Sequence, residues 1–229
     1  MINLHVTRIE KCAHSELQLK QGKIRITAPE SLIQFGLLPI IMEFNELHPA
    51  VEIELICSSS ALDLTSADVD IAFRMTNNPA QDLIGYNLGK LTTATYATKE
   101  LVEHIHNPKN VLRCIAWKNK HNEEWIQRDI INAPDPHVTQ TKKVQIIRTN
   151  SMSVMIEMVR SGYGFARLFS LVADHYSELI QLPNSQVLSS KSLWILTHNE
   201  IRSSARIKSF REFAIERLKS RFHNLDDNS

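Results

Sequence analysis

The chain has 229 residues, 43% of them hydrophobic, so it is long and apolar enough to bury a core and is not intrinsically disordered. Its 26 Lys and Arg residues balance 25 Asp and Glu residues, and no dense basic run occurs, which excludes an electrostatic footprint for nucleic-acid phosphates. Cys12, Cys57 and Cys114 lie far apart without metal-ligand or redox spacing, which excludes a disulfide framework and indicates a reducing compartment.

The first 20 residues carry charges where a signal peptide needs an unbroken apolar core, and no run of about 18 apolar residues occurs anywhere. We therefore expect a cytoplasmic protein that neither enters nor crosses a membrane.

Residues 24–28 alternate between apolar and polar and predict a strand, followed by a turn and a long helical segment. Pro39 falls inside this segment, so we expect a short first turn and then a helix that restarts near Pro39 and ends at Leu47 or His48.

The remaining elements continue the alternation of strands and helices. Further strands are expected at 51–56, 69–73, 83–97, 112–117, 144–147, 165–168 and 193–197. A short helix is expected after the strand at 51–56, ending at about residue 66, and further helices over 123–129, 152–159 and 204–221. The last of them has Ile207, Phe210, Ala214 and Leu218 on its apolar side. Such alternation predicts α/β architecture with parallel sheets covered on both faces.

Enzyme signatures are missing from the sequence, including a nucleophile elbow, a zinc-protease helix, a phosphate loop and a dinucleotide fingerprint. The glycine pair Gly162 and Gly164 follows a helix, which favours a helix end and a turn over a phosphate site. His104 and His106 would point to different faces of a helix, so we expect no metal site and no cofactor. The protein is predicted not to be an enzyme.

Three turns deliver a predicted strand to the start of a helix, at 29–31, 57–60 and 149–151. In an open parallel sheet such turns line the crevice beyond the carboxyl ends of the strands, where free amides and hydroxyls favour anionic groups. The serines and the asparagine in these turns either cap their helices or contact a ligand, and the sequence leaves both readings open.

Several segments, in this order, carry a family resemblance. They are 22–26, Leu37-Leu38-Pro39-Ile40 with Phe44, His48-Pro49-Ala50-Val51, 68–74 and 159–166. Together they resemble the effector-binding domain of LysR-type transcriptional regulators, over about residues 22 to 221. The resemblance implies two Rossmann-like subdomains of the periplasmic-binding-protein type 2 fold, joined by two crossing strands. These would be residues 22–91 with 199–229, and residues 95–196.

The same resemblance implies a ligand site in a cleft between the lobes. The expected ligand contacts are Pro29, Glu30, Ser31, Ser58, Ser59, Arg74, Trp117, Asn150, Ser151 and Phe165. Arg74 would act either as a carboxylate clamp or as a structural strand-end residue, and Trp117 either as the pocket floor or as part of the core. Thr93, Thr95, Thr197 and His198 are the expected hinge.

The resemblance also implies a small-molecule effector, with a carboxylate as one candidate, and a homodimer or tetramer. The family carries a DNA-binding helix-turn-helix before this domain, and residues 1–21 would hold only the end of its linker helix. DNA would then be reached only through a helix-turn-helix outside this chain. A truncated protein, a remnant reading frame and a free-standing sensor stay open. So do hetero-oligomerisation with full-length relatives, a solute-binding protein of the same fold, and an enzyme on the same scaffold.

Overall fold

The computed structural model describes residues 21–58, 69–80, 83–105, 111–118, 124–131, 143–199 and 204–226. The chain divides into unit 1, made of Met1–Lys90 and Lys191–Ser229, and unit 2, made of Leu91–Ser190. The sequence predicted the return to the first subdomain at 196–199. The boundary lies earlier because the last strand pairs with unit 1 from Ser192 onward.

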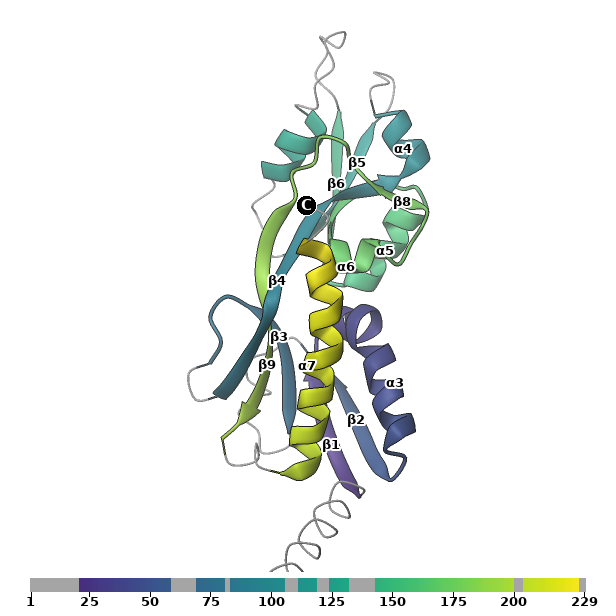
Figure 1. Cartoon of the computed structure of the whole chain (residues 1–229). Coiled ribbons are helices and arrows are strands. Elements are labelled where there is room, and N and C mark those ends of the chain that lie inside the picture. The colour runs from purple at the N-terminus through teal and green to yellow at the C-terminus, as the bar shows by residue number, and fades with distance from the viewer. Residues whose placement is uncertain are drawn as a thin grey trace, which may run out of the picture. The chain divides into compact units, whose positions relative to one another are not determined.

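Within the described residues, the sheet of unit 1 contains β1 (Gly22–Ala28), β2 (Val51–Cys57), β3 (Ile71–Thr76) and β9 (Leu188–His198), in the order β2-β1-β3-β9 (Figure 1). β1 pairs in parallel with β2 and β3, whereas β3 pairs with β9 in antiparallel fashion. The sheet is therefore mixed and not purely parallel as the alternation predicted, because its fourth strand returns from unit 2.

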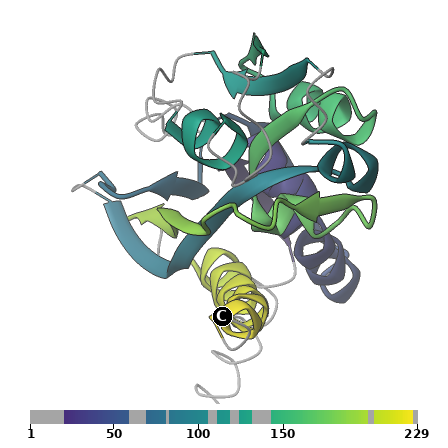
Figure 2. The same ribbon diagram turned by 90° about the horizontal axis from the view of Figure 1, so that it is seen from above.

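The helices of unit 1 are α2 (Glu30–Leu32), the π-helical turn η1 (Ile33–Leu37), α3 (Leu38–Leu47) and α7 (Ala205–Asp226). Pro39 lies in the first turn of α3, which begins and ends where the sequence predicted, although η1 leads into it without a break. The helix α7 is seen nearly end-on in Figure 2. Its four predicted core residues are all at most 2% exposed: Ile207, Phe210, Ala214 and Leu218.

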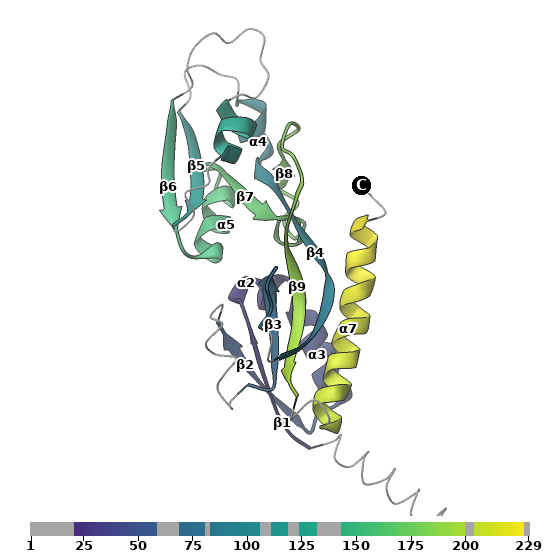
Figure 3. The same ribbon diagram turned by 90° about the vertical axis from the view of Figure 1, so that its left-hand side faces the viewer.

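Unit 2 repeats the strand order of unit 1. Its strands are β4 (Leu83–Thr98), β5 (Leu112–Trp117), β6 (Val144–Thr149), β7 (Phe165–Phe169) and the short β8 (Leu179–Gln181). β5 pairs in parallel with β6 and β7, β7 pairs with β4 in antiparallel fashion, and β8 adds to β4. β4 and β9 each contribute residues to both units, as Figure 3 shows, which confirms the two connecting strands.

The helices of unit 2 are α4 (Lys99–Glu103), the π-helical turn η3 (Ile126–Ile131), α5 (Met152–Arg160) and α6 (Ser170–Ala173). The sequence predicted α5 and placed a short helix near η3, but it missed α4, α6 and β8, which are too short for a periodic signal. Gly162 adopts φ +71° directly after α5, which confirms the helix end. Gly164 allows a close backbone approach, since a Cβ there would lie 2.4 Å from the carbonyl oxygen of Arg113.

Candidate functional site

The first candidate residues of unit 1 lie at the carboxyl end of β1. The Pro29 carbonyl accepts hydrogen bonds from the amides of Leu32 at 2.9 Å and Ile33 at 3.1 Å, which starts the helix without a side-chain cap. Ser31 is only 9% exposed, and its hydroxyl makes no hydrogen bond with any residue in the described part of the chain. Buried hydroxyls normally have a partner. Ser31 therefore does not cap its helix, and its contact with a ligand stays a prediction.

Ser58 lies beside this turn. Its amide donates to the Ala28 carbonyl at 2.9 Å, which extends the β1–β2 pairing by one step. Ser58 is partly buried, whereas Glu30 is exposed. Ser59 lies outside the described residues. The ends of β1 and β2 thus bring Ser58 next to the turn that carries Pro29 and Glu30.

Arg74 lies on β3 and is 6% exposed. Its guanidinium donates to the Phe73 carbonyl at 3.0 Å and to the Thr27 hydroxyl at 3.2 Å. Both acceptors belong to the sheet of unit 1, so these bonds support the structural reading of Arg74. A carboxylate clamp would have to use donors beyond these two.

In unit 2 the candidates follow β5 and β6, which end together because Trp117 pairs with Thr149. Trp117 is partly exposed and Asn150 is exposed. The Ser151 hydroxyl accepts a hydrogen bond from the Val154 amide at 3.4 Å and thereby caps α5. Capping, the alternative that the sequence left open, thus applies to Ser151 and not to Ser31.

Three hydroxyl groups meet where β7 ends and α6 begins. The Ser170 hydroxyl lies 3.1 Å from the Thr92 hydroxyl and 3.2 Å from the Tyr96 hydroxyl. Three hydroxyl hydrogens share only two oxygen–oxygen contacts, so one hydrogen is left to donate elsewhere. This group was not predicted from the sequence, although Thr92 lies in a polar interruption of an otherwise extended apolar segment.

Burial controls protonation around these hydroxyls. It raises the pKa of the Tyr96 phenol, against a smaller opposing effect of the Ser170 hydrogen bond, so Tyr96 stays a neutral donor at physiological pH. Burial also raises the pKa of the Asp174 carboxyl. The Tyr96 phenol is therefore a hydrogen-bond donor in this group.

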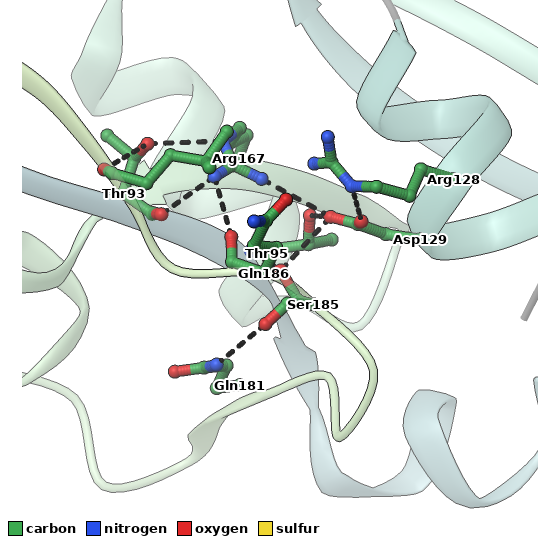
Figure 4. A network of polar contacts seen from close by, with 9 residues as sticks. Thr93, Thr95, Arg128, Asp129, Arg167, Gln181, Ser185 and Gln186 are labelled. Atoms are coloured by element: carbon green, nitrogen blue, oxygen red, sulfur yellow. Dashed lines mark hydrogen bonds and ion pairs between the residues drawn. The ribbon is translucent and has the colours of Figure 1, made fainter. Parts of the chain in front are cut away.

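A buried carboxylate lies at the centre of a second polar cluster in unit 2 (Figure 4). Asp129 is 0% exposed and accepts hydrogen bonds from the hydroxyls of Thr95 at 2.6 Å and Ser185 at 3.0 Å. Arg128 lies 2.8 Å from one of its oxygens, and Arg167 lies 3.3 Å from the other. Four donors on four separate segments thus meet at one carboxylate.

Arg167 connects this cluster to the part of β4 that belongs to unit 2. It donates to the hydroxyl of Thr93 at 3.1 Å and to the carbonyls of Thr93 and Gln186, both at 2.8 Å. Burial lowers the pKa of its guanidinium, and the Asp129 charge opposes that effect. The predicted hinge residues Thr93 and Thr95 are therefore both held by this cluster.

The other two expected hinge residues lie at the end of β9. Thr197 is 2% exposed, and its hydroxyl has no hydrogen-bond partner among the described residues. His198 is partly exposed. Whether these four residues act as a hinge stays a prediction.

Phe165 lies in the interior of unit 2. It is 1% exposed and packs in a core cluster with Cys114, Trp125 and Ile130. The burial follows from its position at the start of a central strand, with β4 and β5 on either side. Phe165 is therefore a core residue with almost no surface for contact with a ligand.

Within the described ranges no group of three or more His, Cys, Asp or Glu side chains is placed to hold a metal ion. Among the described helices, none has the length and apolar character needed to cross a membrane.

Comparison with known proteins identifies the family. The model of the LysR substrate binding domain matches residues 17–219. The chain belongs to the LysR substrate-binding domain family. A curated relative, the probable HTH-type transcriptional regulator LtrA of Klebsiella pneumoniae, is 25% identical over 219 residues, 89% of this chain and 68% of LtrA. The chain covers between 26% and 68% of the length of the curated relatives it matches.

Solved LysR-type structures share the fold. CrgA of Neisseria meningitidis superposes with a TM-score of 0.72 at 17% identity, over 94% of this chain and 76% of that one. The effector domain of AmpR of Pseudomonas aeruginosa superposes with a TM-score of 0.69 at 16% identity, over 89% of this chain and 98% of the domain. This chain therefore has the periplasmic-binding-protein type 2 fold of LysR effector-binding domains, as the sequence predicted.

Proposed function

We propose that this chain is the ligand-sensing domain of a LysR-type transcriptional regulator and has no catalytic role. The family match over residues 17–219 carries the proposal, and the names of the curated relatives, all transcriptional regulators, support it. A cytoplasmic location and control of transcription through a DNA-binding domain follow from the same kinship and are part of the proposal.

The effector is a small molecule rich in hydrogen-bond acceptors, such as a carboxylate. The Ser31 hydroxyl, without a partner among the described residues, and the spare hydrogen of the Thr92–Ser170–Tyr96 group support this chemistry. Glu30 lies in the first turn of its helix and would repel an anion placed close to it. That one ligand touches residues of both units stays a prediction from the family resemblance.

The test is a thermal-shift screen of small carboxylates, each paired with its neutral amide. A ligand present at about a hundred times its dissociation constant stabilises the protein by about 2.7 kcal/mol. Ser31→Ala and Ser170→Ala should each weaken the best carboxylate about tenfold, because each removes a hydrogen bond to a charged group.

Ser177→Ala is the matched control, since Ser177 is an exposed serine of unit 2 outside this set. Its affinity for the same carboxylate should equal that of the unchanged chain. The proposed ligand chemistry would be wrong if amides stabilised the protein as much as carboxylates do. It would also be wrong if Ser31→Ala and Ser170→Ala both bound the carboxylate with unchanged affinity.

A homodimer is the second part of the proposal. The outer strands β2 and β6 carry the exposed apolar residues Leu55 and Ile146. The α3 residues Met42 and Leu47 are 55% and 60% exposed, and Val154 on α5 is 49% exposed. Each unit thus presents an apolar strand and helix, which fits a pairing through a helix and strand of each lobe.

Sedimentation velocity at tens of micromolar tests the dimer. We expect a dimer for the unchanged chain and a shift toward monomer for Met42→Glu and Ile146→Glu, because each buries a charge in the interface. Val187→Glu is the control, since Val187 is 51% exposed but lies outside these helices and strands. A monomeric unchanged chain would contradict the dimer.

A further inference from the structure

The segment that joins β8 to β9 is held on unit 2 mainly by polar contacts. Of its residues 182–187, only Leu182 and Ser185 are buried. The Leu182 amide donates to the Thr95 carbonyl at 2.9 Å, and the Ser185 hydroxyl accepts from the Thr95 amide at 2.7 Å. A segment with so few buried apolar groups depends on hydrogen bonds of this kind for its order.

Arg167 supplies the contacts at the end of this segment (Figure 4). Its guanidinium donates to the carbonyls of Thr93 and Gln186, both at 2.8 Å, so one side chain joins β4 to the segment. The Thr93 hydroxyl accepts from Arg167 at 3.1 Å and donates at 3.5 Å to the carbonyl of Leu188, the first residue of β9. All of these residues belong to unit 2, which ends at Ser190. Arg167 thus holds the chain in place shortly before it leaves unit 2.

The same arginine holds the strand that carries the proposed effector donors. Thr92 directly precedes Thr93, and its hydroxyl lies 3.1 Å from that of Ser170. Ser170 directly follows Phe169, which pairs with Thr93 across β4 and β7. Because Thr93 is bound at both its carbonyl and its hydroxyl, the adjacent backbone is held in the geometry that keeps the Thr92 hydroxyl beside Ser170.

This role of Arg167 is separable from the neutralisation of Asp129. The Asp129 carboxylate lies 2.8 Å from Arg128 and 3.3 Å from Arg167, so Arg167 is the more distant of the two cations. Arg128 makes no hydrogen bond to any other described residue, whereas Arg167 also binds Thr93 and Gln186. A guanidinium serves several acceptors at once because its donors form a rigid fork, which the ammonium of a lysine lacks.

We propose that Arg167 is a latch, a positioning residue that couples the effector donors Thr92 and Ser170 to the segment through which the chain leaves unit 2. A ligand bound at the two hydroxyls stabilises the geometry in which Thr93 contacts Arg167, and Arg167 in turn holds residues 186–188 on β4. By linkage, order at 186–188 and affinity at the hydroxyls rise and fall together. The coupling to a ligand rests on the proposed function, whereas the latch itself is present in the ligand-free chain.

Backbone NMR relaxation of the ligand-free chain tests the latch in Arg167→Lys, which keeps a cation beside Asp129 but loses the fork. We expect the order parameters at 186–188 to fall from about 0.85 to below about 0.6, with β5 and β6 unchanged. Arg128→Lys is the matched control, because it makes the same exchange at the same carboxylate and has no hydrogen bond to β4 or to the segment. Order parameters that stay high in Arg167→Lys, or that fall equally in Arg128→Lys, would overturn the latch. Thermal melts show that each variant is folded.

Titration with benzoate, followed by amide NMR shifts, tests the coupling. Arg167→Lys should weaken benzoate about tenfold, as Ser170→Ala does, whereas Arg128→Lys should bind it normally. Since Arg167 acts through the hydroxyls, the double variant Arg167→Lys/Ser170→Ala should bind no more weakly than Ser170→Ala alone.

Two results would overturn the coupling. They are unchanged benzoate affinity in Arg167→Lys, and losses in the double variant that multiply to about a hundredfold, as independent structural effects would. A chain that binds no benzoate at all would contradict the proposed ligand chemistry and remove the coupling with it. The latch would then still stand or fall on its order parameters, so its failure and that of the proposed function are distinguishable.

Discussion

The two units share one topology but differ in what lies at their centres. In each, the first parallel strand is flanked by the second and the third, and a long antiparallel strand follows the third. Unit 1 is held by aromatic packing, with the Phe44 ring 5.0 Å from Phe210 and 5.5 Å from Phe213. Unit 2 instead buries the Asp129 carboxylate among four donors.

The two kinds of interior restrict the geometry of their units to different degrees. Apolar packing is non-directional, and it tolerates volume-conserving exchanges. A buried carboxylate with arginine and hydroxyl partners is directional, and loss of a single partner leaves a costly unpaired group. Unit 2 thus uses directional bonds at the segment where the chain enters from unit 1, which includes Thr93 and Thr95.

The largest expected effect is in unit 1. Phe210→Ala removes a fully buried ring that joins α7 to α3, and it should lower the free energy of unfolding by about 4 kcal/mol. Urea unfolding measures the loss, and hydrogen exchange should localise the added opening to unit 1. Phe213→Ala is the control and should cost less, since Phe213 is only partly buried. Equal losses for the two would contradict the apolar account of unit 1.

The next effect breaks the centre of unit 2. Asp129→Asn keeps the size of the side chain but removes its charge from two arginines, and we expect a loss of about 3 kcal/mol. Hydrogen exchange should rise at β4 and β7 and not in α7. Asp174→Asn in the same unit is the matched control. Asp174 is exposed and its carboxylate forms no hydrogen bond or ion pair with a described residue, so its replacement should change the free energy of unfolding by less than about 0.5 kcal/mol.

The smallest effect concerns an exposed pair in unit 1. Arg217 donates to both carboxylate oxygens of Glu43, at 2.8 and 3.1 Å, and these hydrogen bonds lower the pKa of Glu43 below its ordinary 4.5. The stability that this pair contributes is present at a pH above the pKa of Glu43 in the unfolded chain. It is lost as the pH falls through the lower pKa of Glu43 in the folded chain. Arg217→Gln should return the pKa of Glu43 toward its ordinary value in an NMR titration. An unchanged titration curve would show that the pair does not form in solution.

Much of the fold was predictable from local patterns. The apolar stripe from Ile207 to Leu218 reflects burial on one face of α7. The alternation at 24–28 and 51–56 identified β1 and β2, although Thr27 is buried and Leu55 is exposed against that alternation. Short elements such as α6 and β8 span too few residues to show a period, and tertiary contacts alone stabilise them.

The candidate site was predictable only in outline. Strand-to-helix turns pointed to Ser31 and Ser151 alike, because both serines stand where a helix begins. The hydrogen-bond partners separate them, since the Ser151 hydroxyl accepts from Val154 whereas that of Ser31 has no described partner. The hydroxyl group at Ser170 was missed because Thr92 and Ser170 lie 78 residues apart.

The sequence by itself determined the family and the succession of the longer strands and helices along the chain, because these depend on the period and order of residues. Only the tertiary structure decided that Asp129 is buried among arginines and hydroxyls, that Phe165 belongs to the core, and that Arg167 binds both Thr93 and Gln186. Those features depend on contacts between segments far apart in the sequence, and no local pattern records which of them meet.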